Sequence, residues 1–186
     1  MGELTTYRRK RDFRLTPEPK PVRGKPAKRL RFVVQKHAAS SLHYDLRLEA
    51  GGVMKSWAVP KGPSMSPANK RLAIPTEDHP ISYNRFEGII PQGQYGAGSV
   101  IVWDRGWYSN ISGEAPERAI KKGAITFELH GDKLKGGWAL RRIGNGRNWI
   151  LVKMKDESAK RTGDITKERP DSVISGRTIE QIARGA

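Results

Sequence analysis

The sequence contains no cysteine and no long apolar run. The absence of cysteine excludes disulfide bonds, thiol nucleophiles and cysteine-ligated zinc, and it suits a reducing cytosol. Nothing approaches the roughly 18 successive apolar residues that span a bilayer. Residues 1–13 carry charge with no apolar stretch behind them, unlike a secretory signal. We therefore expect a soluble, cytoplasmic protein with no membrane partner.

Acidic residues are also scarce. There are 19 aspartates and glutamates against 35 lysines and arginines, which gives a net charge of +16 and a pI near 10.4. Such an excess indicates a polyanionic partner, most commonly nucleic acid. Residues 8–31 contain eleven basic and two acidic residues, and so carry nine of the sixteen net charges. Prolines in this stretch disfavour helix and central strand. We expect an extended basic arm, and a disordered tail is the alternative.

Short strand signals begin at Leu30. Runs rich in β-branched or aromatic residues, separated by turn residues, predict eight strands, at 30–36, 42–49, 53–59, 70–75, 99–104, 124–130, 137–143 and 148–154. Ala50-Gly51-Gly52 predicts a hairpin. Helical signals are confined to 115–122 and 177–183. The pattern predicts a mostly β fold, an antiparallel barrel or sandwich. We divide the chain into an arm (1–29), a β domain (30–156) and a polar tail with a short helix (157–186).

The stretch KHAASSLHYDLRLE, residues 36–49, combines strand alternation with unusual polar residues. His43, Asp45 and Arg47 project from one face of a strand, and Tyr44, Leu46 and Leu48 from the other. His37 precedes a tight connection that would fold it back beside His43. Two imidazoles and a carboxylate suit Mn²⁺, Fe²⁺ or Zn²⁺ better than Ca²⁺. The alternative is a solvent-facing strand surface, which is the default for an antiparallel sheet.

The stretch EDHPISY supplies a second group, with His79 and Tyr83 four residues apart. This spacing places both side chains on a shared side of a strand or a helical turn; an exposed loop histidine is the alternative. Arg47, Lys61 and Arg71 could cradle a phosphate, although each one alone is typical of a solvated surface charge.

The stretch PQGQYGAGSV lacks the lysine and the following helix of a phosphate-binding loop, so we expect a tight turn there. The five tryptophans are expected mainly in the core, with base stacking as the alternative for one of them. His130 is assigned no role.

Three long segments resemble a known family. RFVVQKHAASSLHYDLRLEAGGVMKSWAVPKGP, KRLAIPTEDHPISYNRFEGIIPQGQYGAGSVIVWDRG and KERPDSV are similar to the 3′-phosphoesterase domain of prokaryotic DNA ligase D, a family that includes stand-alone members. RKRDFRLTPEP resembles its N-terminal signature. The resemblance runs from about Tyr7 to Val173 and implies a compact β-barrel with a crescent-shaped active-site groove.

The resemblance also implies roles for individual residues. His37, His43 and Asp45 would bind Mn²⁺, with Co²⁺ or Zn²⁺ as alternatives. Arg47 and His79 would contact the phosphate, and Tyr83 matches an essential tyrosine. The remaining matches fall into three groups: supporting residues Gln35 and Glu77, strand-handling residues Lys61 and Arg71, and arm residues Arg11, Asp12 and Glu18.

The implied reaction removes a 3′-terminal ribonucleoside from a primer–template duplex and then removes the remaining 3′-phosphate. The implied setting is DNA end joining at the prokaryotic nucleoid, alongside ligase and polymerase components. A non-catalytic nucleic-acid-binding barrel remains the alternative, motivated by the charge and the aromatic strands. An Fe(II) oxygenase site is disfavoured, because its third ligand usually follows the His-x-Asp pair at long range.

Overall fold

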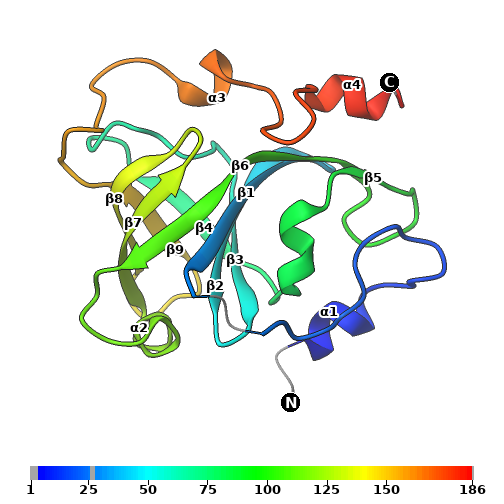
Figure 1. Ribbon diagram of the computed structural model, residues 1–186, viewed down its shortest axis with the longest axis horizontal. Coiled ribbons are helices and arrows are strands. Elements are labelled where there is room, and N and C mark those ends of the chain that lie inside the picture. The colour runs from blue at the N-terminus through cyan, green and yellow to red at the C-terminus, as the bar shows by residue number, and fades with distance from the viewer. Residues whose placement is uncertain (1–3, 26–27, 186) are drawn as a thin grey trace.

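The computed structural model describes residues 4–25 and 28–185, and within these ranges it contains nine strands and a few short helices (Figure 1). The strands are β1 (Leu30–Ala38), β2 (Leu42–Ala50), β3 (Val53–Val59), β4 (Arg71–Pro75), β5 (Gly88–Ile90), β6 (Gly98–Asn110), β7 (Ala124–Gly131), β8 (Lys135–Arg142) and β9 (Trp149–Lys153). The helices are α1 (Thr5–Arg9), the 3₁₀ helix η1 (Ile81–Arg85), α2 (Pro116–Lys122), α3 (Ile165–Glu168) and α4 (Ile179–Ala183).

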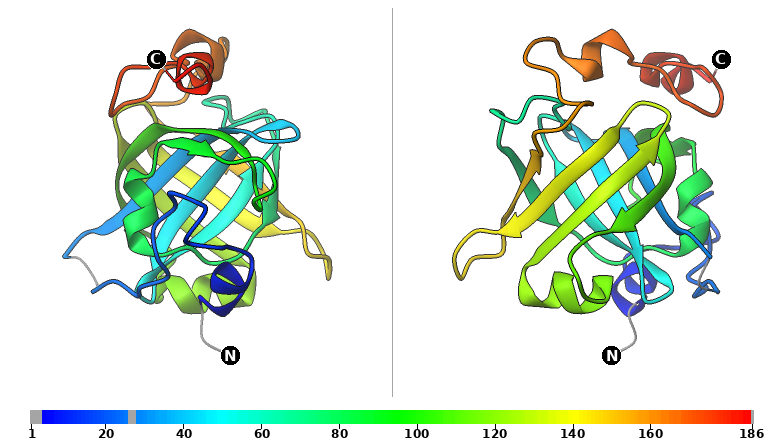
Figure 2. Two further views of the ribbon diagram at one scale, coloured as in Figure 1. Left: turned by 90° about the vertical axis from the view of Figure 1, so that its right-hand side faces the viewer. Right: turned by 60° about the vertical axis from the view of Figure 1, so that its left-hand side comes forward.

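The sheet closes into a barrel. Its strand order is β1-β2-β3-β4-β9-β8-β7-β6-β5, every pair is antiparallel, and β1 also pairs with β6. That last pairing joins the two ends of an eight-stranded barrel and leaves β5 as an extra strand on β6 (Figure 2). Closure removes the free edges that an open sheet would expose. The predicted antiparallel barrel of about eight strands is therefore confirmed.

The hairpin between β2 and β3 sets the register of the strands that carry the site. Gly51 and Gly52 have φ values of +62° and +82°, which a two-residue type I′ turn requires and which glycine adopts without steric cost. Ala50 pairs with Val53 directly across this turn. The predicted hairpin is confirmed.

The barrel interior holds the main hydrophobic core. Tyr44, Leu46 and Leu48 point inward from β2 and are at most 4% exposed. They pack with tryptophans from four other parts of the sheet: Trp57, Trp103, Trp138 and Trp149. The fifth, Trp107, lies outside this core and stacks on His130 with ring centroids 3.6 Å apart. Interior packing therefore fixes which face of β2 turns outward.

Several elements differ from the sequence expectations. The helices α2 and α4 begin one and two residues later than predicted, and the Thr178–Gln181 capping box is present at α4. The strand β5 and the helices α1, η1 and α3 were not predicted, because each is five residues or fewer and lacks a full period of pattern. The division into arm, β domain and tail stays a prediction, and residues 1–3, 26–27 and 186 of it lie outside the described residues.

In the described part of the chain, none of the helices has both the length and the apolar character needed to cross a bilayer.

Candidate metal and phosphate site

The outward face of β1 and β2 forms the floor of a cavity of about 280 Å³. The arm, the segment around η1 and the loop between β5 and β6 surround it, and Figure 2 (left) shows the dark-blue arm in front of these strands. The lining residues are Arg11, His37, Ala39, Ser40, His43, Asp45, Arg47, Thr76, Glu77, His79, Tyr83, Ile90, Tyr95 and Gly96. The polar face of β2 is therefore enclosed, and the alternative of a solvent-facing strand surface is wrong: Asp45 and Arg47 are 5% and 3% exposed.

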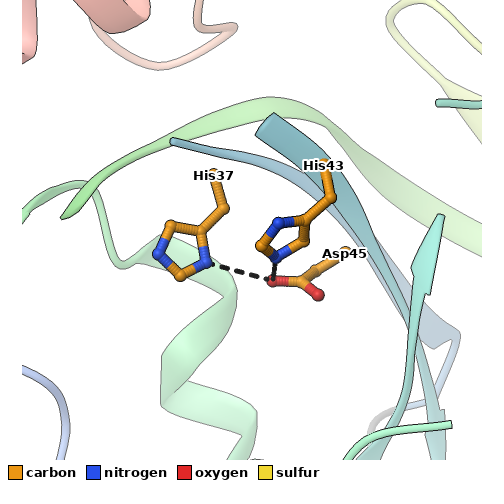
Figure 3. A group of neighbouring side chains, drawn as sticks. All are labelled: His37, His43 and Asp45. Carbon is orange, nitrogen blue, oxygen red and sulfur yellow. Dashed lines mark ion pairs between the residues drawn. The ribbon is translucent and has the colours of Figure 1, made fainter. Parts of the chain in front are cut away.

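Strand register brings the two histidines together. His37 on β1 pairs directly with His43 on β2, and cross-strand partners are the closest side-chain neighbours in a sheet. Asp45 follows on the same face of β2, since side chains alternate. His37 Nδ1 and His43 Nε2 each lie 3.7 Å from Asp45 Oδ2 (Figure 3). The three groups offer ligand atoms within 4.8 Å of one another.

Backbone carbonyls orient both imidazoles. His37 Nε2 lies 2.8 Å from the carbonyl oxygen of Gly96, and His43 Nδ1 lies 3.0 Å from that of Ser41. A carbonyl only accepts, so we assign the ring proton of each neutral imidazole to these nitrogens. The unprotonated nitrogens then face Asp45. Metal-ligating histidines are commonly held in this way, with the second ring nitrogen bonded to a carbonyl.

The charged groups around Asp45 stabilise its ionised form. Burial acts to raise the pKa of Asp45, but the Arg47 guanidinium, together with hydrogen bonds that the two histidines donate when they are protonated, holds it well below its usual value. Burial also acts to lower the pKa of His43, yet the nearby Asp45 carboxylate raises it overall. The site therefore presents an ionised carboxylate, which is the form that binds a cation.

Arg47 links the candidate metal ligands to the rest of the cavity. Its Nη2 donates to Asp45 Oδ2 at 3.1 Å and its Nε donates to Gln35 Oε1 at 2.8 Å. The Gln35 amide nitrogen in turn donates to the carbonyls of Tyr83 and Phe86. Gln35 thus connects β1 to η1 and fixes the orientation of the Arg47 guanidinium.

His79 enters the site beside Arg47. Its backbone forms an antiparallel bridge with Met54 at the start of β3. Its Nδ1 lies 2.8 Å from the Glu77 carbonyl and 3.0 Å from Arg47 Nη1. We assign the ring proton to Nδ1, because the shorter contact is to an acceptor. Burial, Arg47 and Arg11 hold the pKa of His79 well below its usual value, so the ring is neutral.

This depressed pKa predicts a pH dependence of folding stability. The unfolded state takes up a proton near pH 6.5, whereas the folded state resists protonation until a lower pH, so the free energy of unfolding falls as pH drops below about 6.5. In EDTA, a His79→Gln variant should lack this contribution, which amounts to about 1.4 kcal/mol in total between pH 7.5 and pH 5.5 when the unfolded pKa is about 6.5. Urea unfolding at pH 7.5, 6.5 and 5.5 measures it. The opposing contribution of His43 is common to both proteins and cancels in the difference, so parallel curves would contradict the assignment.

The arm completes the cavity opposite β2. The Tyr83 hydroxyl donates to Glu18 Oε1 at 2.7 Å, and burial together with Glu18 raises the pKa of Tyr83 well above its usual value. Arg11 donates to Glu18 at 2.9 Å and to Glu77 at 3.0 Å. The sequence-predicted residues Arg11, Glu18, Gln35 and Glu77 therefore join the same network as His79 and Tyr83.

Three sequence-predicted residues lie outside this group. Lys61 is exposed, and Arg71 is half-buried on β4; neither lines the cavity. Asp12 accepts hydrogen bonds from the backbone and guanidinium of Arg14, which lower its pKa to about 2. The strand-handling role of the two basic residues and the role of Asp12 stay predictions.

Sequence reasoning missed three arm and loop residues. The Tyr7 ring is fully buried and lies edge-on to His79, with centroids 5.1 Å apart, and Arg11 covers its face. Lys10 Nζ donates to Glu77 and to the Tyr95 hydroxyl. Tyr7 shares its highly charged tract with a second aromatic residue, Phe13, so composition alone does not single it out. The hydrogen bond between Lys10 and Tyr95 joins residues 85 positions apart, so no local sequence pattern reveals it.

Comparisons with known proteins agree on one family. The family model described as the DNA ligase D 3′-phosphoesterase domain matches residues 35–142. The multifunctional non-homologous end joining protein LigD of Pseudomonas aeruginosa is 54% identical over 183 residues, which is 95% of this chain and 22% of that protein. The LigD proteins of Mycolicibacterium smegmatis and Mycobacterium tuberculosis are 46% and 43% identical over 168 and 171 residues, covering 88% and 90% of this chain and 22% of each relative. The chain thus spans about a fifth of the length of these relatives.

Proposed function

The chain belongs to the DNA ligase D 3′-phosphoesterase domain family, and from this premise we propose that it is a metal-dependent phosphoesterase that heals DNA 3′ ends. It hydrolyses the bond that joins a 3′-terminal ribonucleoside to its primer strand and then hydrolyses the 3′-phosphate left behind. The product is a 3′-OH, which a polymerase or ligase needs. The relatives are named for non-homologous end joining, and we place this activity in the same process, at the nucleoid.

The observation that carries the proposal is the convergence of His37, His43 and Asp45 beside Arg47 in one cavity. Had the unprotonated ring nitrogens pointed away from Asp45, the enzymatic interpretation would have been lost. They point toward it (Figure 3). A purely nucleic-acid-binding surface has no need for such a buried arrangement.

The donor set fits a divalent transition metal. His37 Nδ1, His43 Nε2 and Asp45 Oδ2 would hold the ion, and the carbonyls of Gly96 and Ser41 already fix the two ring orientations. Mixed imidazole and carboxylate donors suit Mn²⁺, with Co²⁺ and Zn²⁺ as competitors. When bound, the cation supplies Lewis-acid stabilisation of the charge on phosphate oxygens.

The chain's own residues complete the phosphate site. The Arg47 guanidinium, held in plane by Gln35 and Asp45, is oriented to grip phosphate oxygens. His79 is neutral before substrate enters, because two arginines oppose its protonation. A bound phosphate offsets those positive charges, so His79 gains a proton on Nε2 and donates it to the phosphate or to the leaving oxygen. Tyr83, whose proton is directed to Glu18, keeps its ring packed against His79 with centroids 4.7 Å apart.

Two hydrolyses follow in order. In the first, the oxygen of a water molecule bonds to phosphorus and the bond to the 5′ oxygen of the terminal nucleoside breaks; the nucleoside leaves with a proton on that oxygen. In the second, another water displaces the 3′ oxygen of the primer and releases inorganic phosphate. The net charge of +16 favours binding of the duplex that carries the end.

A 5′-labelled primer–template duplex with one 3′-terminal ribonucleotide tests the proposal. With Mn²⁺ the primer should shorten by one nucleotide to a 3′-phosphate and then convert to a 3′-OH; with EDTA neither product should form. The same duplex ending in a deoxynucleotide is the matched control, because the 2′-OH is what distinguishes RNA from DNA at a site. Duplex binding without any metal-dependent shortening would instead favour the non-catalytic binding barrel.

A further inference from the structure

Tyr95 stands at the mouth of the cavity on the loop between β5 and β6. Two tyrosines of the described residues line the cavity. Tyr83 is buried, at 2% exposed, whereas Tyr95 is 48% exposed. Gly93 and Gly96 on either side have φ values of +82° and +77°, which side-chain-bearing residues rarely adopt. The loop therefore has a specified turn, and it presents an aromatic ring at an opening that leads to the candidate metal ligands.

Lys10 holds the ring of Tyr95, and His37 holds the loop backbone beside it. Lys10 Nζ donates to the Tyr95 hydroxyl at 2.9 Å and lies 4.1 Å from the ring centroid. The next residue, Gly96, carries the carbonyl that accepts from His37 Nε2. The position of Tyr95 is thus coupled directly to the orientation of one candidate metal ligand. An exposed aromatic held this way is preorganised for contact and has little rotamer freedom left to lose.

The cavity is too small to enclose a whole nucleotide comfortably. Its volume of about 280 Å³ lies below the roughly 300–1,000 Å³ typical of pockets that bury a drug-sized ligand. The charged groups at its floor, Arg47, His79 and the candidate metal ligands, suit the phosphate. A base attached to that phosphate through its ribose must then lie at the mouth, where Tyr95 is.

We infer that Tyr95 is the stacking platform for the base of the 3′-terminal nucleoside. The inference rests on the proposed function and adds a subsite to it, one that recognises the leaving nucleoside by its flat aromatic surface. Stacking of this kind tolerates every base, because each has a π face. Lys10 and Arg11, whose charges lie 4.1 Å and 5.6 Å from the ring centroid, support the ring from the arm.

The subsite should matter for the first hydrolysis more than for the second. In the first step the terminal nucleoside is present and leaves. In the second step it has already gone, and a 3′-phosphate end offers no base to this subsite. The ratio of the two activities therefore reports on Tyr95, whereas a general defect in the site lowers both activities together.

The test compares kcat/KM for the two steps in wild type and in Tyr95→Ala, on duplexes ending in a ribonucleotide or in a 3′-phosphate. We expect the ratio of diesterase to monoesterase activity to fall about tenfold, the scale of one base–aromatic stack. Tyr95→Phe, which keeps the ring and loses the bond to Lys10, should retain the wild-type ratio within about threefold. If Tyr95→Phe and Lys10→Met reproduce the tenfold fall, the residue only anchors the arm and the inference is overturned.

A substrate change gives an independent reading. A duplex ending in a ribose without a base should lose the same factor in wild type, and Tyr95→Ala should show little further loss with it, because the partners of one contact are not additive. Additive losses overturn the inference.

A third reading needs no catalysis. In EDTA, a terminal 2-aminopurine ribonucleotide should lose fluorescence on binding wild type and keep it with Tyr95→Ala. Quenching without cleavage in Mn²⁺ would refute the proposed function and leave the stacking inference intact. Cleavage without quenching would refute the stacking inference and leave the proposed function intact.

Discussion

A His43→Ala variant should lose both hydrolytic activities by at least a hundredfold while it still folds and binds duplex DNA. His43 supplies one of the three candidate ligand atoms, and substitution even of the outer residues that orient metal ligands costs about 10–100-fold. The side chain is 20% exposed, so its truncation opens the cavity and leaves no sealed void in a core. Assays of both steps at saturating Mn²⁺, with duplex affinity measured in EDTA, separate the two effects.

His130→Ala is the matched control for that experiment. His130 is also a partly exposed strand histidine, but it stacks on Trp107 and does not line the cavity. We expect it to keep both activities. Mn²⁺ affinity from isothermal titration should fall with His43→Ala and stay unchanged with His130→Ala. Wild-type cleavage by the His43→Ala variant would show that the metal assignment is wrong.

The barrel and the floor of the site could be read from local sequence pattern. Alternation in residues 42–49 separates an inward apolar face from an outward polar face, and the structure places both as expected. Pairing of His37 with His43 followed from a short connection between adjacent strands. The burial of the polar face could not be deduced this way, because it depends on the arm and on η1, which cover it from distant parts of the chain.

The arm shows why local pattern is insufficient. Its prolines and charges indicated an extended segment, and composition left disorder open as an alternative. In the structure Tyr7 is fully buried and Glu18 is 4% exposed. Their partners, His79 and Tyr83, lie more than 60 residues away. The resemblance to a known family pointed to Arg11 and Glu18, whereas Tyr7, Lys10 and Tyr95 became visible only from tertiary contacts.

An Arg47→Met variant should be destabilised by about 3 kcal/mol in EDTA, because it leaves the buried Asp45 carboxylate without its main charge partner. Arg47 Nη2 is 3.1 Å from Asp45 Oδ2, and both side chains are less than a tenth exposed. Methionine fills similar volume without charge, so lost packing contributes little. Urea unfolding at pH 7.5 measures the change in the free energy of unfolding.

Mn²⁺ should restore part of that loss, and more of it in Arg47→Met than in wild type. A ligand that binds the folded state stabilises it by RT ln(1 + [L]/Kd). Removal of a guanidinium beside Asp45 also removes the repulsion between that cation and the metal, so Kd falls and the gain at a fixed Mn²⁺ concentration grows. The double variant His43→Ala/Arg47→Met is the control, since it keeps the unpaired carboxylate and lacks one ligand; its gain should be smaller. Equal gains in the two variants would mean that Mn²⁺ binds elsewhere, and that Asp45 is paired with Arg47 for structural reasons alone.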